Sequence, residues 1–134
     1  MRSRIYVLGL GASAAVAVAG CGSAGTFQNK PRPATPVNLT VYVNDHRVSV
    51  SPSTVGAGPV QFIVTNEAQR NVSLDIQSGT NHGSTGPINP GATDQLTVNM
   101  QTGKATVSTG SSIQAAHLKI GPPRPSASNA LLQP

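Results

Sequence analysis

The chain contains no tryptophan and only two phenylalanines and two tyrosines among its 134 residues. It has a single cysteine, Cys21, so no disulfide can form within the chain. Binding of single-stranded nucleic acid uses a basic groove and aromatic side chains on which bases stack, and the sequence indicates neither. We therefore expect a core of aliphatic side chains and no nucleic-acid partner.

Acidic residues are also scarce, which restricts the enzyme chemistry open to the chain. Its only side-chain carboxylates are those of Asp45, Glu67, Asp75 and Asp94. Asp45 is adjacent to His46, which is typical of a single turn and not of a catalytic relay. No Gly-x-Ser-x-Gly turn is present to expose a nucleophilic serine. We therefore predict that the protein is not an enzyme.

The first twenty residues have the organisation of an export signal. Arg2 and Arg4 supply positive charge, and residues 5–19 form an apolar run without a charged side chain. This run is shorter than the roughly 20 residues that span a bilayer, which argues against a permanent transmembrane helix. The small residues before Cys21 suit cleavage by a signal peptidase. Residues 1–20 are therefore predicted to be a signal peptide.

The end of this segment, Val18-Ala19-Gly20-Cys21, resembles the lipobox of bacterial lipoproteins. The resemblance implies that the Cys21 thiol accepts a diacylglyceryl group, which carries fatty acyl chains such as palmitate, before cleavage between Gly20 and Cys21. Two acyl chains hold a protein stably on a membrane, whereas one does not. Ordinary secretion, with Cys21 as an incidental thiol, is the alternative. The predicted location is the extracytoplasmic face of the cell membrane.

The mature chain that this cleavage would leave is weakly basic. Without Arg2 and Arg4, seven Lys and Arg residues remain against four Asp and Glu residues, a net charge of +3. These cations are scattered along the sequence, which favours a solvated surface without a cationic cluster. Residues 21–36 contain three prolines and no periodic pattern, so they are predicted to form a tether between the anchor and the folded domain.

Residues 37–120 alternate apolar and polar side chains with period two, the pattern of half-buried strands. About seven short strands separated by turn residues predict an all-β domain, a small antiparallel β-sandwich. Residues 56–59 are predicted to lead into the strongest strand, and residues 78–93 to form a long loop held to the body by Ile88. A hairpin turn is predicted at residues 101–104. From residue 121 to residue 134 we expect a proline-rich, mobile tail.

Residues 52–67, PSTVGAGPVQFIVTNE, resemble the early core of cupredoxins. That family often reads proline, an apolar residue, Ala-Gly, alternating apolar residues and then asparagine. Residues 88–93 are similar to its proline-glycine step into a later strand, and residues 103–107 to the hairpin that follows. The resemblance covers roughly residues 37–120 and implies a cupredoxin-like, Greek-key sandwich.

The copper ligands of cupredoxins are not matched. A type 1 copper site uses two imidazoles and a thiolate, usually with an axial thioether. Val72 or its neighbours occupy the place of the family's first histidine, and the later Cys, His and Met cluster is missing. Cys21 is the only thiol, and the lipobox assigns it to lipid. We therefore predict no type 1 copper site and no cofactor.

Hypotheses of different classes remain for the function. One is a lipid-anchored binding or accessory module whose loops, chiefly residues 78–93, contact another envelope protein or a surface ligand. The alternative is a protein that handles copper or zinc with the ligands His46, His82, His117 and Met100. His117 is expected to point away from the core. A purely structural envelope protein without a specific partner is the third hypothesis.

Overall fold

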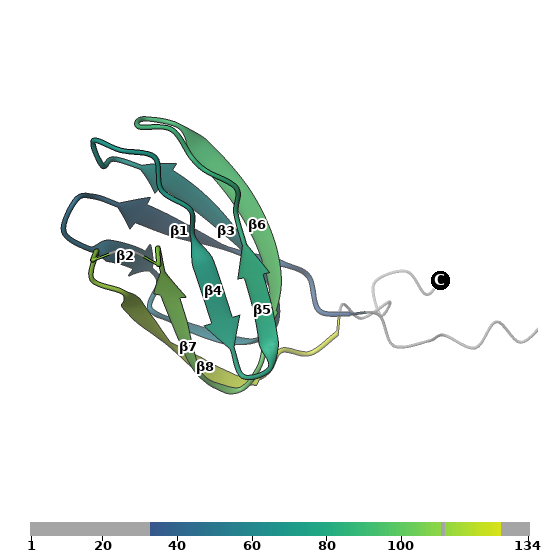
Figure 1. Ribbon diagram of the computed structural model, residues 1–134. Helices are drawn as coiled ribbons and strands as arrows, with labels where there is room; N and C mark the ends of the chain where they lie inside the picture. Colours follow the sequence, from purple (N-terminus) through teal and green to yellow (C-terminus); the bar gives the residue numbers. More distant parts are fainter. Residues whose placement is uncertain (1–32, 111, 127–134) are drawn as a thin grey trace, which may run out of the picture.

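The computed structural model of the protein describes residues 33–110 and 112–126. The predicted signal peptide, Cys21, most of the tether and residues 127–134 lie outside the described residues. Within the described part the chain forms eight β-strands and no helix (Figure 1). The strands are β1 (Val37–Val43), β2 (Val48–Ser51), β3 (Thr54–Asn66), β4 (Asp75–Ser78), β5 (Asn81–Ser84), β6 (Thr93–Met100), β7 (Gly103–Ser108) and β8 (Ala116–Pro123). Over these residues, no helical segment has the length and apolar character needed to cross a bilayer.

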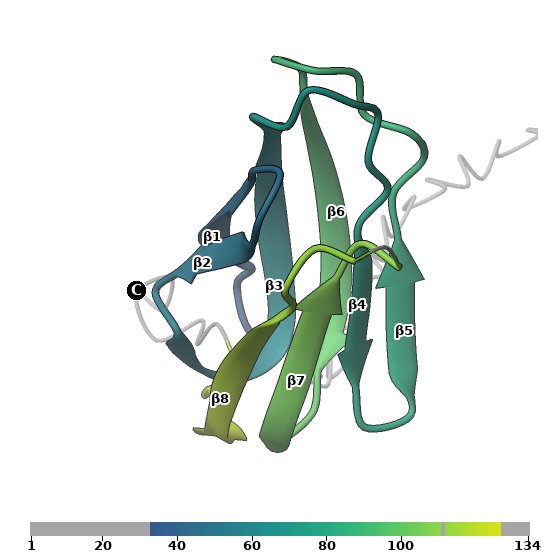
Figure 2. The ribbon, with the colours of Figure 1, turned by 60° about the vertical axis from the view of Figure 1, so that its left-hand side comes forward.

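The strands form two facing layers that share β3 (Figures 1 and 2). One layer has the order β2-β1-β3-β6, and the other has the order β3-β8-β7-β4-β5. The pairs β1–β3 and β3–β8 are parallel, whereas the other pairs are antiparallel. The predicted all-β sandwich is therefore confirmed, with eight strands in place of about seven and with mixed instead of purely antiparallel pairing.

β3 belongs to both layers because it turns a corner near its start (Figure 2). Its residues from Thr54 to Ala57 pair with β8, and those from Gly58 to Thr65 pair with β6. The register with β8 shifts between Gly56 and Ala57, and Gly58 has a φ of 125°, in the region that favours glycine. The segment predicted to lead into the strand is thus part of the strand, and its glycines form the corner.

The alternating apolar side chains meet between the two layers. Leu39, Val41 and Val43 of β1 are fully buried, whereas Tyr42 is exposed, as the alternation predicts. Phe62, on β3, is the largest of the fully buried side chains. One cluster of buried apolar residues joins both layers, and each such side chain contributes about 1.5–3 kcal/mol when it is removed from water. Both ends of the sandwich therefore depend on the same core.

β5 lies inside the segment 78–93 that is predicted to be a loop. Its residues include no large apolar side chain, so the sequence gives no strand pattern there. β5 instead pairs with β4 at the edge of its layer, and Gly83 lies against Val98 of β6. A Cβ atom on Gly83 would approach Val98 Cγ2 to 2.5 Å, so the contact requires glycine. The loop prediction is wrong for residues 81–84, whereas the expected burial of Ile88 is confirmed.

The predicted hairpin at residues 101–104 is also wrong. β6 pairs with β3 in one layer, whereas β7 pairs with β4 and β8 in the other. Gln101 and Thr102 therefore carry the chain across the sandwich. Turn-forming residues mark a reversal of the chain, but they do not determine whether the next strand pairs with the previous one. In β8 the strand continues to Pro123, past the expected end of the sheet at Ile120.

Candidate functional site

The two ends of the sandwich differ in what they present (Figure 1). At one end, which we call the tether end, the chain enters β1 through residues 33–36 and leaves β8 through residues 124–126. At the opposite end, which we call the loop end, β1 and β3 stop, and residues 44–47, 67–71 and 86–92 connect the strands. Binding residues are often carried on loops that a rigid framework positions, so the loop end is the first candidate site.

Asn66, the last residue of β3, organises the loop end. Its side chain is fully buried, and its amide nitrogen donates to the carbonyl oxygens of Arg70 and Ile88, each at 2.8 Å. The side-chain oxygen of Asn66 accepts from the backbone amide of Ala68 at 2.9 Å. The backbone amide of Gly91 donates to the Asn66 carbonyl at 2.7 Å. One buried asparagine therefore fixes two loops that are distant in sequence.

The turn at residues 44–47 is joined to the same framework. Asn44 Oδ1 accepts from two backbone amides within this turn, at 3.0 and 2.8 Å. The Asp45 carboxylate accepts from the backbone amide of Gln69 at 3.2 Å, which links the turn to residues 67–71. These hydrogen bonds order three loops before any ligand binds. The sequence predicts a turn at Asp45-His46 and a loop over residues 78–93, but it does not predict the contacts between the loops.

Only part of the predicted binding segment reaches the loop end. Residues 79 and 80 form the turn between β4 and β5 at the opposite end, and residues 81–84 form β5. Residues 86–92 lie at the loop end, where Ile88 is buried and most of its neighbours are exposed. The single contact loop expected from sequence is therefore divided, and residues 86–92 are the part that lies with the other loops.

The structure does not bring the proposed metal ligands together. His46 lies between β1 and β2, His82 on β5 and His117 on β8, and all three are exposed, as expected for His117. Met100 is buried in the core at 2% exposure. β4 and β7 separate His82 from His117, so at ~4.8 Å per strand their backbones are about 14 Å apart. In the described part of the chain, no group of three or more His, Cys, Asp or Glu residues is placed to hold a metal ion.

The contact between His82 and Asp75 is weak. His82 Nε2 lies 3.7 Å from Asp75 Oδ1 on the neighbouring strand. The two side chains are 60% and 41% exposed, so water screens any attraction between them. This pair therefore contributes little to the fold and does not form a buried site.

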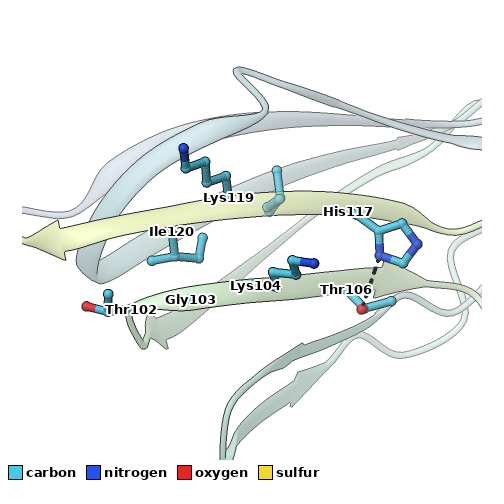
Figure 3. A pocket seen from close by; sticks show the side chains of 8 residues that line it. Thr102, Gly103, Lys104, Thr106, His117, Lys119 and Ile120 are labelled. Atoms are coloured by element: carbon cyan, nitrogen blue, oxygen red, sulfur yellow. Dashed lines mark hydrogen bonds between the residues drawn. The ribbon is translucent and has the colours of Figure 1, made fainter.

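A shallow groove along β7 and β8 is the second candidate site (Figure 3). It encloses about 840 Å³, and its polar lining residues are Thr102, Lys104, Thr106, His117 and Lys119. Lys104 and Lys119 are directly opposite in the ladder, and Thr106 Oγ1 lies 3.4 Å from His117 Nδ1. The lining also includes Leu118 and Ile120, and it has two cations and no carboxylate.

Arg124 joins the entry and exit of the described chain at the tether end. Its Nη1 donates to the Thr35 carbonyl at 2.7 Å, and its Nη2 donates to the Pro59 carbonyl. The Arg124 backbone amide donates to the Ala57 carbonyl at 3.0 Å. These contacts hold residue 124 on the body of the domain, although the sequence predicts a mobile tail from residue 121. These partners are backbone groups, and no carboxylate is among them.

The fold of the chain resembles those of solved structures, whereas comparisons of its sequence gave no match. No protein-family profile and no curated protein sequence matches it. Dithionite-reduced auracyanin from the photosynthetic bacterium Roseiflexus castenholzii superposes with a TM-score of 0.50 at 10% identity, over 67% of this chain and 99% of that chain. Lac15 from a marine microbial metagenome gives a TM-score of 0.54 at 9% identity, over 75% of this chain. The chain has a cupredoxin-like fold. It spans 37% of Lac15, and at these identities the likeness concerns the fold alone.

The residues of this cupredoxin-like domain do not fit a type 1 copper centre. The described residues include no cysteine, and their three histidines lie on separate elements. Val72, near the position of the first histidine in the family, is buried at 5% exposure and pairs with Ile88. The adjacent polar side chain, that of Asn66, already has backbone partners. Apolar packing and closed hydrogen bonds therefore occupy this part of the fold, without the ligand set that copper requires.

Proposed function

We propose that the protein is a non-catalytic binding module, anchored by lipid on the extracytoplasmic face of the cell membrane. In this proposal Cys21 carries the acyl chains, and residues 22–36 connect it to the sandwich. The loop end contacts another envelope protein or a surface ligand. The observation that carries the proposal is the position of the hydrogen-bonded loops at the end opposite the entry of the chain.

The length of β1 supports this arrangement. Its seven residues cover about 23 Å between the tether end and the loop end. An anchor at Cys21 pulls on residue 33, so the loop end is the end that remains accessible to a partner. The bonds of Asn66 and Asp45 order the loops in advance, which lowers the entropy cost of binding.

The anchor is tested with the variant Cys21→Ser. Loss of the thiol should abolish acylation, and the protein should move from the detergent-rich phase to the aqueous phase in detergent phase separation. Mass spectrometry of the wild-type protein should identify an acylated N-terminal Cys21. An unmodified thiol, a retained leader or unchanged partition of the variant would contradict the anchor.

The binding surface is tested by photo-crosslinking in intact cells. A photoreactive residue at Gln69 or Asn89, both exposed at the loop end, should give a discrete crosslinked product. Thr97, exposed on β6, is the matched control position and should not give that product. Identical products from all three positions, or no product from the loop end, would refute the assignment of this surface.

A further inference from the structure

The fold gathers cations that are scattered in the sequence. Lys104 lies near the start of β7 and Lys119 directly opposite on β8, although fifteen positions separate them in the chain. Arg124 follows the end of β8 and contacts Thr35, where the chain enters the sandwich. Lys104 and Lys119 are therefore direct neighbours, whereas Arg124 is five residues, or about 16 Å, beyond Lys119 along β8. Lys104 and Lys119 are exposed, as predicted for a solvated surface, but they lie side by side, which their separation in the sequence does not indicate.

The acidic side chains lie elsewhere. Asp45, Glu67 and Asp94 are at the loop end, where Asp94 pairs with Val64 near the end of β3. Asp75, at the start of β4, is four residues from the turn between β4 and β5, or about 13 Å along the strand. Among the described residues, the tether end thus has three cations and no carboxylate.

The pair formed by Lys104 and Lys119 is unfavourable without a counter-charge. Residues directly opposite in an antiparallel ladder have Cβ atoms about 4.5–5.5 Å apart, and like charges there are destabilising. Figure 3 shows the two side chains pointing in different directions from β7 and β8. A negative charge in or over this groove would interact favourably with both.

The chain outside the described residues indicates where that negative charge lies. Eleven residues lie between Cys21 and Pro33, the first described residue, so the twelve steps along the chain reach at most about 43 Å. An anchor at Cys21 therefore keeps the tether end within this distance of the membrane. The cations of this end are then available to the lipid surface.

We propose that the tether end docks on the anionic phospholipid surface of the membrane, with Lys104, Lys119 and Arg124 as its cationic contacts. The orientation in this proposal rests on the proposed lipid anchor. Each Lys or Arg near an anionic leaflet strengthens partition roughly fivefold, and the effect falls off within about 8–10 Å at moderate salt. The headgroup phosphates occupy the groove along β7 and β8, and the loop end is directed away from the membrane.

The experiment measures how fast an amine-reactive reagent labels the lysines of the acylated protein on vesicles. One set of vesicles contains phosphatidylcholine alone, and the other contains one part phosphatidylglycerol to two parts phosphatidylcholine. Labelling of Lys104 and Lys119 should be at least about fivefold slower on the anionic vesicles. The difference should disappear in 1 M salt, where the screening length falls to about 3 Å.

Variants test whether the protection depends on the lysines at the tether end or only on the total charge of the protein. Lys104→Gln should reduce the protection of Lys119 on anionic vesicles, and Lys119→Gln should do the same for Lys104. Arg47→Gln and Arg70→Gln each remove one cation at the loop end and serve as matched controls. These two variants should leave the protection of both lysines unchanged.

Several results would overturn the proposal. Equal labelling on the two kinds of vesicle, or protection that persists in 1 M salt, would exclude electrostatic docking on lipid. Protection by soluble polyglutamate, with none from anionic vesicles, would reassign the surface to an acidic polypeptide. Protection by inorganic phosphate alone to the same extent would reassign the groove to a free anion.

The same digest also reports on the anchor. Its N-terminal peptide shows by mass whether Cys21 is acylated, independently of the lysine labelling. An unacylated peptide with protected lysines would refute the anchor and retain the docking surface. An acylated peptide with lysines labelled equally on both vesicles would retain the anchor and refute the docking.

Discussion

The loop end and the tether end are built on the same strands, but they use their polar groups in opposite ways. At the loop end, Asn66 and Asp45 accept or donate hydrogen bonds within the protein, and the acidic and basic residues are mixed. At the tether end, Lys104 and Lys119 oppose each other without a carboxylate in the groove. At the loop end, these polar groups have hydrogen-bond partners within the protein. The tether end has excess positive charge, which a partner of negative charge would neutralise.

The two ends of a small sandwich can thus differ in the kind of partner that they suit. Hydrogen bonds between loops order a surface without giving it a net charge, which suits recognition of a specific partner. A group of unpaired cations attracts any anionic surface and needs little geometric detail.

The shared core gives the largest expected effect. Phe62→Ala should lower the free energy of unfolding by about 3–5 kcal/mol, because Phe62 is fully buried on the strand that both layers share. Denaturant unfolding, followed by hydrogen exchange at both ends, should show that the two ends are destabilised together. If one end kept its protection while the other lost it, the two ends would not depend on a common core.

Removal of the loop-end asparagine should have a smaller and local effect. Asn66→Ala leaves the Ile88 carbonyl and the Ala68 amide without their side-chain partner, at an expected cost of about 2–3 kcal/mol. Hydrogen exchange should accelerate in residues 67–71 and 86–92 and remain slow in β7 and β8. Asn71→Ala, at an exposed position in the same loop, is the control and should change stability by less than about 0.5 kcal/mol. Equal effects of both substitutions would show that Asn66 does not organise the loops.

Arg124 provides the corresponding test at the tether end. Arg124→Ala removes the side-chain contacts with the Thr35 and Pro59 carbonyls, at an expected cost of about 1 kcal/mol. Hydrogen exchange should accelerate around residues 35–37 and 57–59, and the loop end should not change. Arg124→Lys keeps the charge but loses the planar, multi-donor geometry, so it should reproduce this local loss while keeping much of the docking on anionic vesicles. Retained protection of residues 35–37 in both variants would contradict the structural role of Arg124.

The smallest expected effect on stability comes from one charge reversal. Lys104→Glu replaces a like-charge pair with an opposite-charge pair across from Lys119, which should stabilise the fold by up to about 0.5 kcal/mol. The same change should weaken the protection of Lys119 on anionic vesicles. Thermal unfolding and lysine labelling measure the two effects separately. A variant that is more stable and still docks fully would show that the lysine pair is not needed for contact with the membrane.

Much of the architecture was predictable because burial leaves a period-two pattern. β1 alternates between buried Leu39, Val41 and Val43 and outward polar residues, so its position and orientation follow from the sequence. The strand β5 was not predictable, because its Asn-His-Gly-Ser residues pair at an edge and leave Gly83 against β6. The wrong hairpin at residues 101–104 has a related cause, since local turn residues do not specify the layer of the next strand.

The two ends were harder to predict than the strands. The lysine pair at the tether end depends on the register between β7 and β8, which places Lys104 opposite Lys119. Arg124 binds backbone carbonyls, which every residue has, so its partners cannot be identified from residue types. Asn66 was visible only as the asparagine that ends a cupredoxin-like strand pattern. The lipidation of Cys21 and the absence of catalysis and of a cofactor stay predictions.

The junction of Arg124 with Thr35 also has a mechanical consequence. A partner held at the loop end and an anchor beyond residue 33 would pull the domain along the axis of β1 and β3, which run parallel over seven paired positions. Such a load acts in shear, so the hydrogen bonds between these strands resist it together and do not open one after another. The guanidinium connects the point of traction to β3 and β8 as well, and the domain is thus arranged to transmit force along its length without unzipping at its edge.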